Sequence, residues 1–235
     1  MNLAIVGYGK MGRLIEELAP EYGFEVTLKL DEHNNANYEG MTRENFENID
    51  VAIEFSVPSV TVGNIERMAA LGVDMVIGTT GWLGELERVR PIVEKAGVGL
   101  VWSPNYSIGV NILSRLVAEA ARLFANEGEY GAWAWEIHHS TKKDAPSGTL
   151  LKLVERMKQA GYQRPIDTSS NRAGRHPGTH EIGFDSAADT ITLRHTARSR
   201  EGFARGALKA AWWIAGKKGF YEFSDVIFNK GAGEV

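Results

Sequence analysis

The first twelve residues restrict the fold more than any other segment of the chain. A short apolar run at residues 3–6 leads directly into Gly7-Tyr8-Gly9-Lys10-Met11-Gly12, and apolar residues then recur at helical spacing. In a G-x-G-x-x-G turn between a strand and a helix, Gly7 allows the tight turn, Gly9 lets a pyrophosphate approach the backbone, and Gly12 lets the helix pack on the strand. The helix N-terminus adds N–H groups that bind phosphate. The segment predicts a dinucleotide site; the alternative is a glycine-rich turn of another doubly wound protein.

Asp31 indicates which dinucleotide is bound. It ends the second predicted strand, at residues 24–30, and follows the glycine turn at the distance expected for a ribose-binding acid. A carboxylate there accepts hydrogen bonds from the ribose hydroxyls of NAD and repels a 2′-phosphate. We therefore expect NAD(H), with NADP(H) left open because neighbouring loops can supply a cation. The alternative is that Asp31 only caps the turn that follows it.

The first hundred residues alternate short apolar runs with helical patterns. This alternation predicts an α/β fold, a Rossmann-type doubly wound parallel sheet. The expected strands are residues 3–6, 24–30, 51–55, 73–77 and 98–102, and the later helices are residues 59–71 and 83–96, with a break or kink at Pro91.

The pattern changes after residue 104, which predicts a second, smaller α+β domain with an open mixed sheet. Along the strand at residues 133–138, Trp133, Trp135 and Ile137 face one way, and Glu136 and His138 face the other. We expect domains at residues 1–104 and 105–203, divided near residues 103–107. The other expected elements are helices at 113–124, 149–160 and 204–215, strands at 180–184 and 190–196, and a long polar loop at 162–178.

Composition excludes several classes of function. There are no cysteines, which removes disulfides, thiolate metal sites and thiol nucleophiles. Lys and Arg total 26 against 30 Asp and Glu, so a concentrated basic surface for nucleic acid or anionic membranes is not expected. No apolar run approaches the roughly 20 residues of a membrane-spanning helix. We expect a cytoplasmic protein.

The loop between the 133–138 strand and the next helix carries the most specific chemistry. It holds His138, His139 and Lys142, which are side chains that exchange protons or stabilise a developing anion. Gly148 and Thr149 open the following helix, whose N-terminus attracts a carboxylate or phosphate. The two adjacent histidines could instead be a metal pair or plain loop residues. No further ligand stands at conventional metal spacing, so the sequence predicts an anion pocket and no metal site.

Two further turns follow predicted strands of the first domain. Gly78-Thr79-Thr80-Gly81 follows the fourth strand, and Ser103-Pro104-Asn105-Tyr106 follows the fifth. Open α/β sheets bind ligands at this carboxyl edge. Taken alone, each segment is equally typical of an ordinary turn.

Four motifs together resemble one enzyme family, 4-hydroxy-tetrahydrodipicolinate reductase (dihydrodipicolinate reductase) of lysine and diaminopimelate biosynthesis. They are the glycine turn at 7–12, Gly-Thr-Thr-Gly at 78–81, Pro-Asn-Tyr-Ser-Ile-Gly-Val-Asn at 104–111 and Glu-Ile-His-His-Ser-Thr-Lys-Lys-Asp-Ala-Pro-Ser-Gly-Thr at 136–149. Arg172, His180 and the stretch 195–203 fit later family blocks, so the resemblance covers nearly the whole chain.

The resemblance implies NAD(P)H-dependent reduction of a cyclic dicarboxylate by a homotetramer built through the second domain. It implies that His138 donates or accepts a proton and that Lys142 donates the proton completing reduction after hydride transfer. His139 and the backbone of Gly148 and Thr149 would hold the substrate carboxylates. Residues 78–80 and 103–106 would line the nicotinamide, and the segment 204–235 would return to the first domain.

The chain departs from the family pattern in places, and two other functions remain open. The chain is short, its glycine turn is compact, Val57 replaces an often basic residue, and Arg175-His176-Pro177 is an uncommon loop filling. Another amino-acid or imine dehydrogenase on this architecture would act on a monocarboxylate. A non-catalytic NADH sensor would bind cofactor without turnover, and the His138–Lys142 pair weighs against it.

Overall fold

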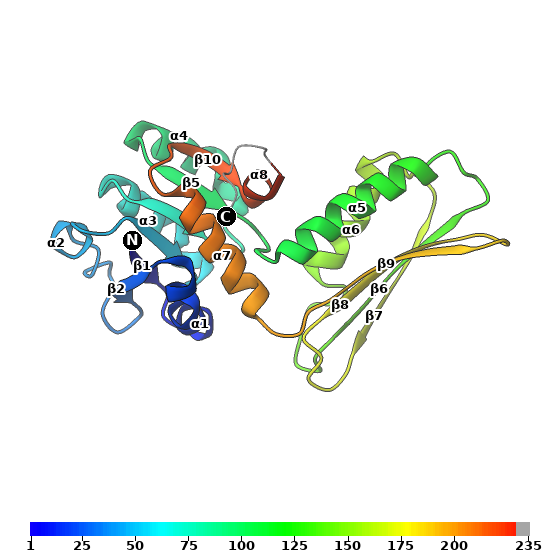
Figure 1. The fold of residues 1–235 in the computed structure, drawn as a ribbon, viewed down its shortest axis with the longest axis horizontal. Coiled ribbons are helices and arrows are strands. Elements are labelled where there is room, and N and C mark those ends of the chain that lie inside the picture. Colours follow the sequence, from blue (N-terminus) through cyan, green and yellow to red (C-terminus); the bar gives the residue numbers. More distant parts are fainter. Residues whose placement is uncertain (229–235) are drawn as a thin grey trace. The chain divides into compact units, whose positions relative to one another are not determined.

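The structure is a computed structural model that describes residues 1–228 (Figure 1). The described chain divides into two compact units: Met1–Tyr106 with residues 203–228, and Ser107–Gly202. The part of the predicted 204–235 segment beyond residue 228 lies outside the described residues.

The first unit is built on a six-stranded, all-parallel sheet in the order β10-β5-β4-β3-β1-β2. This confirms the predicted Rossmann-type doubly wound fold. β1 lies between β2 and β3, so the chain reverses its winding direction beside β1, where such sheets open a ligand crevice at the carboxyl ends. The strands are β1 (Asn2–Val6), β2 (Glu25–Leu30), β3 (Val51–Glu54), β4 (Asp74–Ile77), β5 (Gly99–Trp102) and β10 (Gly219–Glu222).

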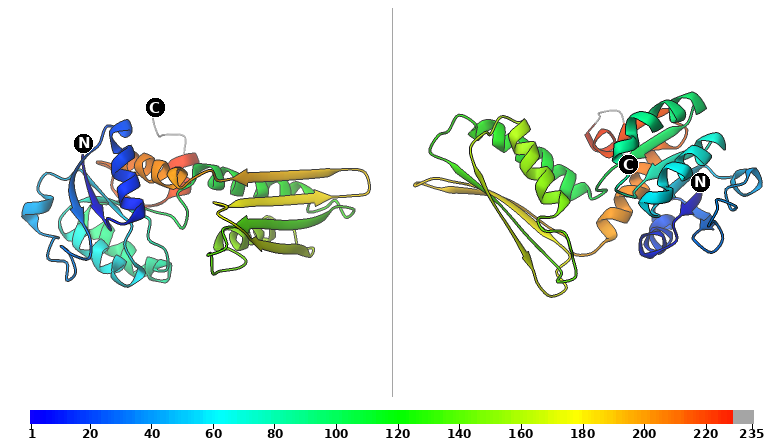
Figure 2. Two further views of the ribbon diagram at one scale, coloured as in Figure 1. Left: turned by 90° about the horizontal axis from the view of Figure 1, so that it is seen from below. Right: turned by 180° about the vertical axis from the view of Figure 1, so that it is seen from behind.

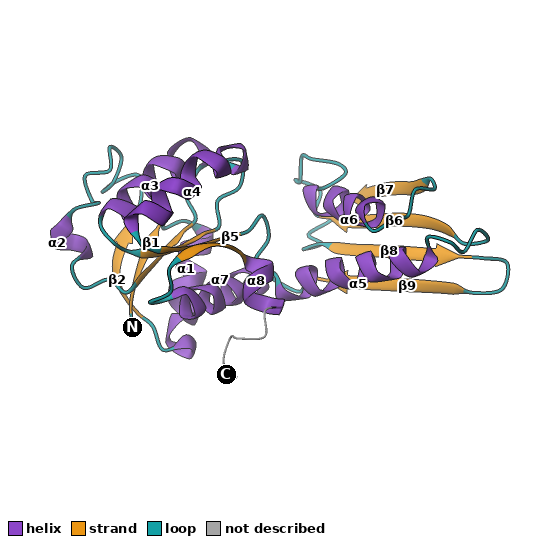
Figure 3. Cartoon of the chain, turned by 90° about the horizontal axis from the view of Figure 1, so that it is seen from above, coloured by secondary structure: helices purple, strands orange, loops and turns teal. Residues whose placement is uncertain are grey.

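Helices cover both faces of this sheet (Figure 3). On one face α3 (Pro58–Ala70) and α4 (Leu86–Ala96) bury Met68, Val89 and Val93 against strand residues such as Met75. On the other face lie α1 (Lys10–Leu18) and α7 (Glu201–Ile214). The shorter helices are η1 (Ala19–Tyr22), α2 (Arg43–Phe46), η2 (Leu83–Glu85) and α8 (Phe223–Phe228).

Two details of the first unit differ from expectation. α4 runs through Pro91 without ending there, since Val89 and Val93 are both fully buried and hold the helix on either side of it. The 83–96 segment instead changes from the 3₁₀ helix η2 to α4 at Leu86. β10 was not predicted, because Gly219–Glu222 is a short half-buried segment with no apolar alternation. It pairs in parallel with β5.

The second unit is a four-stranded mixed sheet in the order β7-β6-β8-β9, as expected for an open mixed sheet. β6 and β7 are parallel, and the other pairs are antiparallel. α5 (Ile108–Phe124) and α6 (Gly148–Gln159) cover one face, where Val117, Leu153 and Phe184 are fully or almost fully buried (Figure 1). The strands are β6 (Gly131–His138), β7 (Ile166–Arg172), β8 (Thr179–Asp185) and β9 (Thr190–Thr196).

The predicted loop at 162–178 is wrong, because Ile166–Arg172 forms the edge strand β7. Its sequence is polar, and its side chains alternate between half-buried and exposed, so no apolar periodicity marks it. An edge strand needs only one hydrogen-bonded neighbour, and β6 supplies it in unbroken register from Ala132–Ile166 to His138–Arg172.

The other face of this sheet carries large side chains without a covering helix from residues 107–202, all of which the structure describes. Trp133, Trp135 and Ile137 of β6 lie on it half-exposed, while Glu136 and His138 point to the helix side and are buried. Figure 2 (left) shows the strands in front with the helices behind them. Within residues 1–228 no helix has both the length and the apolar character needed to cross a membrane.

Candidate active site

The three glycines of the first turn have different surroundings. Gly7 adopts φ +98°, and a Cβ there would lie 2.2 Å from the carbonyl oxygen of Phe55. A Cβ on Gly12 would lie 2.6 Å from the Gly7 oxygen. A Cβ on Gly9 would meet no heavy atom within 4 Å. Gly7 and Gly12 are therefore required by the fold, whereas the space beside Gly9 is the room that a pyrophosphate needs. The turn fits a dinucleotide.

Charged side chains surround the Tyr8 ring in this turn. The Tyr8 hydroxyl donates to the Glu16 carboxylate on α1, and Lys29 of β2 donates to the same carboxylate at 2.9 Å. Lys29 and Arg13 lie 5.2 and 5.6 Å from the Tyr8 ring centroid. Lys10 is exposed, and Met11 is half-buried. Sequence reasoning overlooked Glu16 and Lys29, which fix the Tyr8 ring.

Asp31 lies half-buried where β2 ends and is part of a turn. Its Oδ1 accepts the His33 N–H at 2.8 Å, and its own N–H donates to Asn34 Oδ1 at 2.8 Å. The capping role considered for Asp31 is therefore present. It occupies one carboxylate oxygen and leaves the residue at the carboxyl edge of the sheet.

The turn after β4 is fastened to the turn after β3. Thr79 Oγ1 accepts the Ser56 N–H at 2.8 Å, and a Cβ on Gly78 would lie 2.1 Å from the Phe55 ring. Beneath them Glu54 is fully buried, and burial raises the pKa of its carboxyl group. Thr80 is exposed at the edge of the turn. These contacts give the 78–80 segment a defined shape beside the glycine turn.

The segment 103–106 after β5 is fixed by hydrogen bonds within itself and to the sheet. Ser103 Oγ accepts the Asn105 N–H at 3.1 Å, and Pro104 is half-buried. Tyr106 is buried, and its hydroxyl lies 3.0 Å from the Ile77 oxygen and 2.9 Å from the Val101 oxygen. The Tyr106 side chain thus supports the sheet.

Glu136 is the centre of the site in the second unit. Its side chain is fully buried on β6, and Oε1 accepts three hydrogen bonds: from Ser147 N at 2.8 Å, Ser170 Oγ at 3.0 Å and Arg172 Nη2 at 2.8 Å. Burial by itself raises the Glu136 pKa, but the bonds from Ser147 and Arg172 outweigh it and hold the pKa below its usual value. Glu136 is therefore a buried carboxylate.

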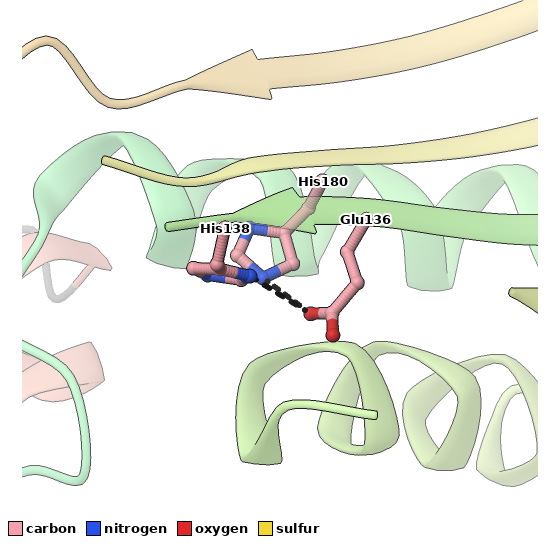
Figure 4. Close-up of side chains that lie close together, drawn as sticks. All are labelled: Glu136, His138 and His180. Carbon is pink, nitrogen blue, oxygen red and sulfur yellow. Dashed lines mark ion pairs between the residues drawn. The ribbon is translucent and has the colours of Figure 1, made fainter. Parts of the chain in front are cut away.

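The second oxygen of Glu136 faces two imidazoles (Figure 4). Oε2 lies 3.4 Å from His138 Nδ1 and 3.4 Å from His180 Nε2, and it also accepts the Ser147 hydroxyl. Burial lowers the pKa of His138, against the opposing effect of Glu136. Burial, and repulsion from His138 once that imidazole is protonated, lower the pKa of His180 to about 4. Both imidazoles are therefore neutral near pH 7.

Lys142 pairs with a carboxylate from its own loop. Its Nζ lies 2.7 and 2.9 Å from the two Asp144 oxygens, and this contact lowers the Asp144 pKa. The Gly148 N–H also bonds to that carboxylate. Asp144 thus bridges the Lys142 ammonium group and the N-terminus of α6, and both of these groups bind carboxylates. His139 Nδ1 lies 2.8 Å from Thr141 Oγ1, and Thr149 is the second residue of α6.

The strand register explains which functional residues the sequence could not identify. Glu136 is the direct cross-strand partner of His180, and His138 is that of Arg172. The His138–Arg172 pairing could not be inferred while 162–178 was read as a loop, and the Glu136–His180 pairing needed the register of two strands that were predicted without one. The available sign was the two-residue spacing of Glu136 and His138, which puts both on one face of a strand. Lys142 is near enough for its charge to lower the His138 pKa.

Comparisons with known proteins agree over almost the whole chain. Residues 1–106 match the family model "Dihydrodipicolinate reductase, N-terminus", and residues 109–227 match "Dihydrodipicolinate reductase, C-terminus". The 4-hydroxy-tetrahydrodipicolinate reductase of Christiangramia forsetii is 36% identical over 238 residues, covering 97% of this chain and 98% of the relative. That of Ralstonia nicotianae is 36% identical over 197 residues, covering 76% of this chain and 74% of the relative.

A solved structure shares the fold. Dihydrodipicolinate reductase from Paenisporosarcina sp. TG-14, bound to dipicolinate, superposes with a TM-score of 0.81 at 21% identity. The match covers 96% of this chain and 98% of that one.

Proposed function

The chain belongs to the dihydrodipicolinate reductase family, and from this premise we propose that it reduces 4-hydroxy-tetrahydrodipicolinate to tetrahydrodipicolinate with a nicotinamide cofactor, in lysine and diaminopimelate biosynthesis. The observation that carries the proposal is the joint match of both family models, which leaves almost no part of the chain outside the family. When bound, the reduced nicotinamide supplies a hydride from its C4 atom.

The substrate is a cyclic dicarboxylate, and the 136–149 segment offers it positive groups. We propose that one carboxylate displaces Asp144 from Lys142 and from the Gly148 N–H, because the Asp144 carboxylate already satisfies both donors in the way a substrate carboxylate would. His139 and Thr149 would complete the pocket. The dipicolinate bound by the Paenisporosarcina relative is a ligand of the same class.

The two proton-transfer candidates differ in charge. Burial keeps His138 neutral near pH 7, while Lys142 carries an ammonium group paired with Asp144. We therefore assign Lys142 as the acid that donates the proton after hydride transfer, and His138 as the neutral imidazole that accepts or relays a proton. Glu136 Oε2 faces His138 Nδ1 and orients the ring.

We propose NAD(H) as the preferred cofactor. Asp31 lies where ribose hydroxyls are bound in such folds, and its negative charge opposes a 2′-phosphate. Use of NADP(H) remains part of the proposal, because Lys29 and Arg13 bring positive charge to Tyr8 in the glycine turn. Residues 7–12, 78–80 and 103–106 would contact the cofactor. Comparing kcat/KM for NADH and NADPH in wild type and Asp31→Asn tests this, since the variant should shift the ratio toward NADPH.

A homotetramer assembled through the second unit is also proposed, in the cytoplasm where reduced nicotinamides are available. The half-exposed face with Trp133, Trp135 and Ile137 supports it, because such aromatic area is typical of interfaces. Trp133→Lys should reduce the sedimentation coefficient to that of smaller species while leaving the far-ultraviolet circular dichroism unchanged. A wild-type chain that sediments as a monomer would contradict the assembly.

The reaction is tested by a coupled assay in which the preceding synthase generates the substrate and cofactor oxidation is followed. Lys142→Ala should lower kcat by about 10²–10⁴-fold, the usual contribution of a positioned acid, with NADH affinity unchanged. The neighbouring exposed Lys143→Ala is the matched control and should retain near wild-type turnover. Equal turnover of Lys142→Ala and wild type rules out the assigned role.

A further inference from the structure

Hydrogen bonds explain only part of the Glu136–His138–His180 cluster. The Ser147 hydroxyl donates to Glu136 Oε2 and lies 3.2 Å from His180 Nε2, whereas His138 Nδ1 has no hydrogen-bond partner among the described residues. Glu136 Oε2, His138 Nδ1 and His180 Nε2 lie within 4.8 Å of one another, and all three residues are buried (Figure 4). We propose that these three atoms bind one divalent transition-metal ion, such as Zn²⁺, reversibly.

The spacing of the donors fits an ion better than a water molecule. Two of the separations, from Oε2 to each imidazole nitrogen, are 3.4 Å. Zinc bonds of about 2.0–2.2 Å in a tetrahedral site put neighbouring ligand atoms about 3.3–3.5 Å apart. The partners of a tetrahedral water, each at about 2.8 Å, lie about 4.5 Å apart.

The donor atoms are oriented for such an ion. Glu136 Oε1 takes the three bonds from Ser147, Ser170 and Arg172, so Oε2 is the oxygen that faces the histidines. His138 is only 8% exposed, and its Nδ1 has no hydrogen-bond partner among residues 1–228. An unpartnered buried nitrogen beside a carboxylate is unfavourable unless a proton or a cation lies between them.

The surrounding charges set the strength of binding. One carboxylate and two imidazoles are a donor set typical of zinc, with a fourth position left for solvent. Arg172 lies 2.8 Å from Oε1, and the charge of Lys142 acts on His138, so both oppose a second cation. The ion is thus bound reversibly from solution and is not a permanent part of the fold.

Metal binding has a consequence that rests on the proposed function. An ion on Nδ1 holds the His138 ring and leaves its single proton on Nε2, so the imidazole can no longer accept a proton there and turnover would be inhibited. Zinc availability would then regulate the enzyme through the same imidazole that serves the reaction.

Binding is tested first without substrate, on the full chain with Co²⁺ as a spectroscopic probe and Zn²⁺ as competitor. We expect one Co²⁺ per chain with the intense visible bands of four-coordinate cobalt, displaced by Zn²⁺. His180→Gln and Glu136→Gln should each weaken binding by at least about 100-fold, since loss of even an outer partner of a ligand costs about 10–100-fold. His33→Gln is the control, because its side chain is 83% exposed and far from the cluster in sequence.

The outcomes separate the two proposals. Wild-type affinity in either ligand variant, with native circular dichroism, overturns the metal site, as does a six-coordinate cobalt spectrum. If Co²⁺ binds as expected but Zn²⁺ leaves turnover unchanged, the metal site stands and the role of His138 in the reaction fails. Inhibition that a chelator reverses, in parallel with the spectrum, supports both.

Discussion

Burial of His180 should make the stability of the protein depend on pH in a specific direction. Its folded pKa of about 4 lies below the ordinary value of 6.5, so the unfolded chain binds the proton more readily than the folded protein. The contribution of this residue to stability is therefore complete above about pH 6.5. It decreases as the pH falls from 6.5 toward 4, and it levels off below that.

The size of the effect follows from the two pKa values. The full difference corresponds to about 3 kcal/mol of unfolding free energy, of which about 2 kcal/mol is lost between pH 7 and pH 5. The side chain is 7% exposed, so solvent screening reduces this little. Carboxylates such as Glu136, whose pKa is lowered, lose their contribution at still lower pH.

Urea unfolding at pH 7, 6 and 5 measures this, with wild type compared to His180→Gln. Glutamine keeps a polar side chain but does not titrate, so the variant should lose about 2 kcal/mol less than wild type between pH 7 and pH 5. Circular dichroism at pH 7 checks that the variant is folded. Parallel pH dependences for the two proteins would refute the reasoning, because the proton uptake would then belong to other groups.

Two further predictions concern the glycine turn and the loop carboxylate. Gly9→Ala should leave the melting temperature unchanged and weaken NADH binding at least about tenfold, because its Cβ enters space that only the cofactor fills. Gly12→Ala should instead lose about 1–3 kcal/mol of unfolding free energy, because its Cβ would lie 2.6 Å from the Gly7 oxygen. Thermal melts and fluorescence titrations with NADH distinguish the two effects. Asp144→Asn should lower the substrate KM by about 2–10-fold, since Lys142 and the Gly148 N–H no longer hold an internal carboxylate. A raised KM in the coupled assay would show that Asp144 positions Lys142 for the substrate instead of competing with it.

The sequence predicted the elements that carry a local pattern of apolar residues or a capping residue. β1 to β5 and α6 lie close to their expected bounds, since buried apolar runs and a serine cap mark them locally. β7 and β10 were not predicted, because each is an edge strand whose place depends on a partner far along the chain. No local pattern encodes such pairing.

Dependence on distant strand pairing also explains which site residues could be predicted and which could not. His138 and Lys142 stand in one loop and could be named from residue type alone. His180 and Arg172 reach Glu136 only through the register of β8 and β7 on either side of β6. Tyr106 is the opposite case, a residue that sequence reasoning placed in the site. Its motif indicated a ligand contact, but its hydroxyl bonds to backbone carbonyls of the sheet.

The pairing of β10 with β5 affects the order in which the protein can be completed during synthesis. The second unit is one continuous segment, Ser107–Gly202, so all of its strands have been made once Gly202 leaves the ribosome. The sheet that begins with the first residues must wait for Gly219–Glu222 to gain its last strand. Until then β5 presents an unpaired edge to the cell. The N-terminal unit, translated first, is thus the one whose folding finishes last, and its exposed β5 edge is where a chaperone or a misplaced strand would attach to the nascent chain.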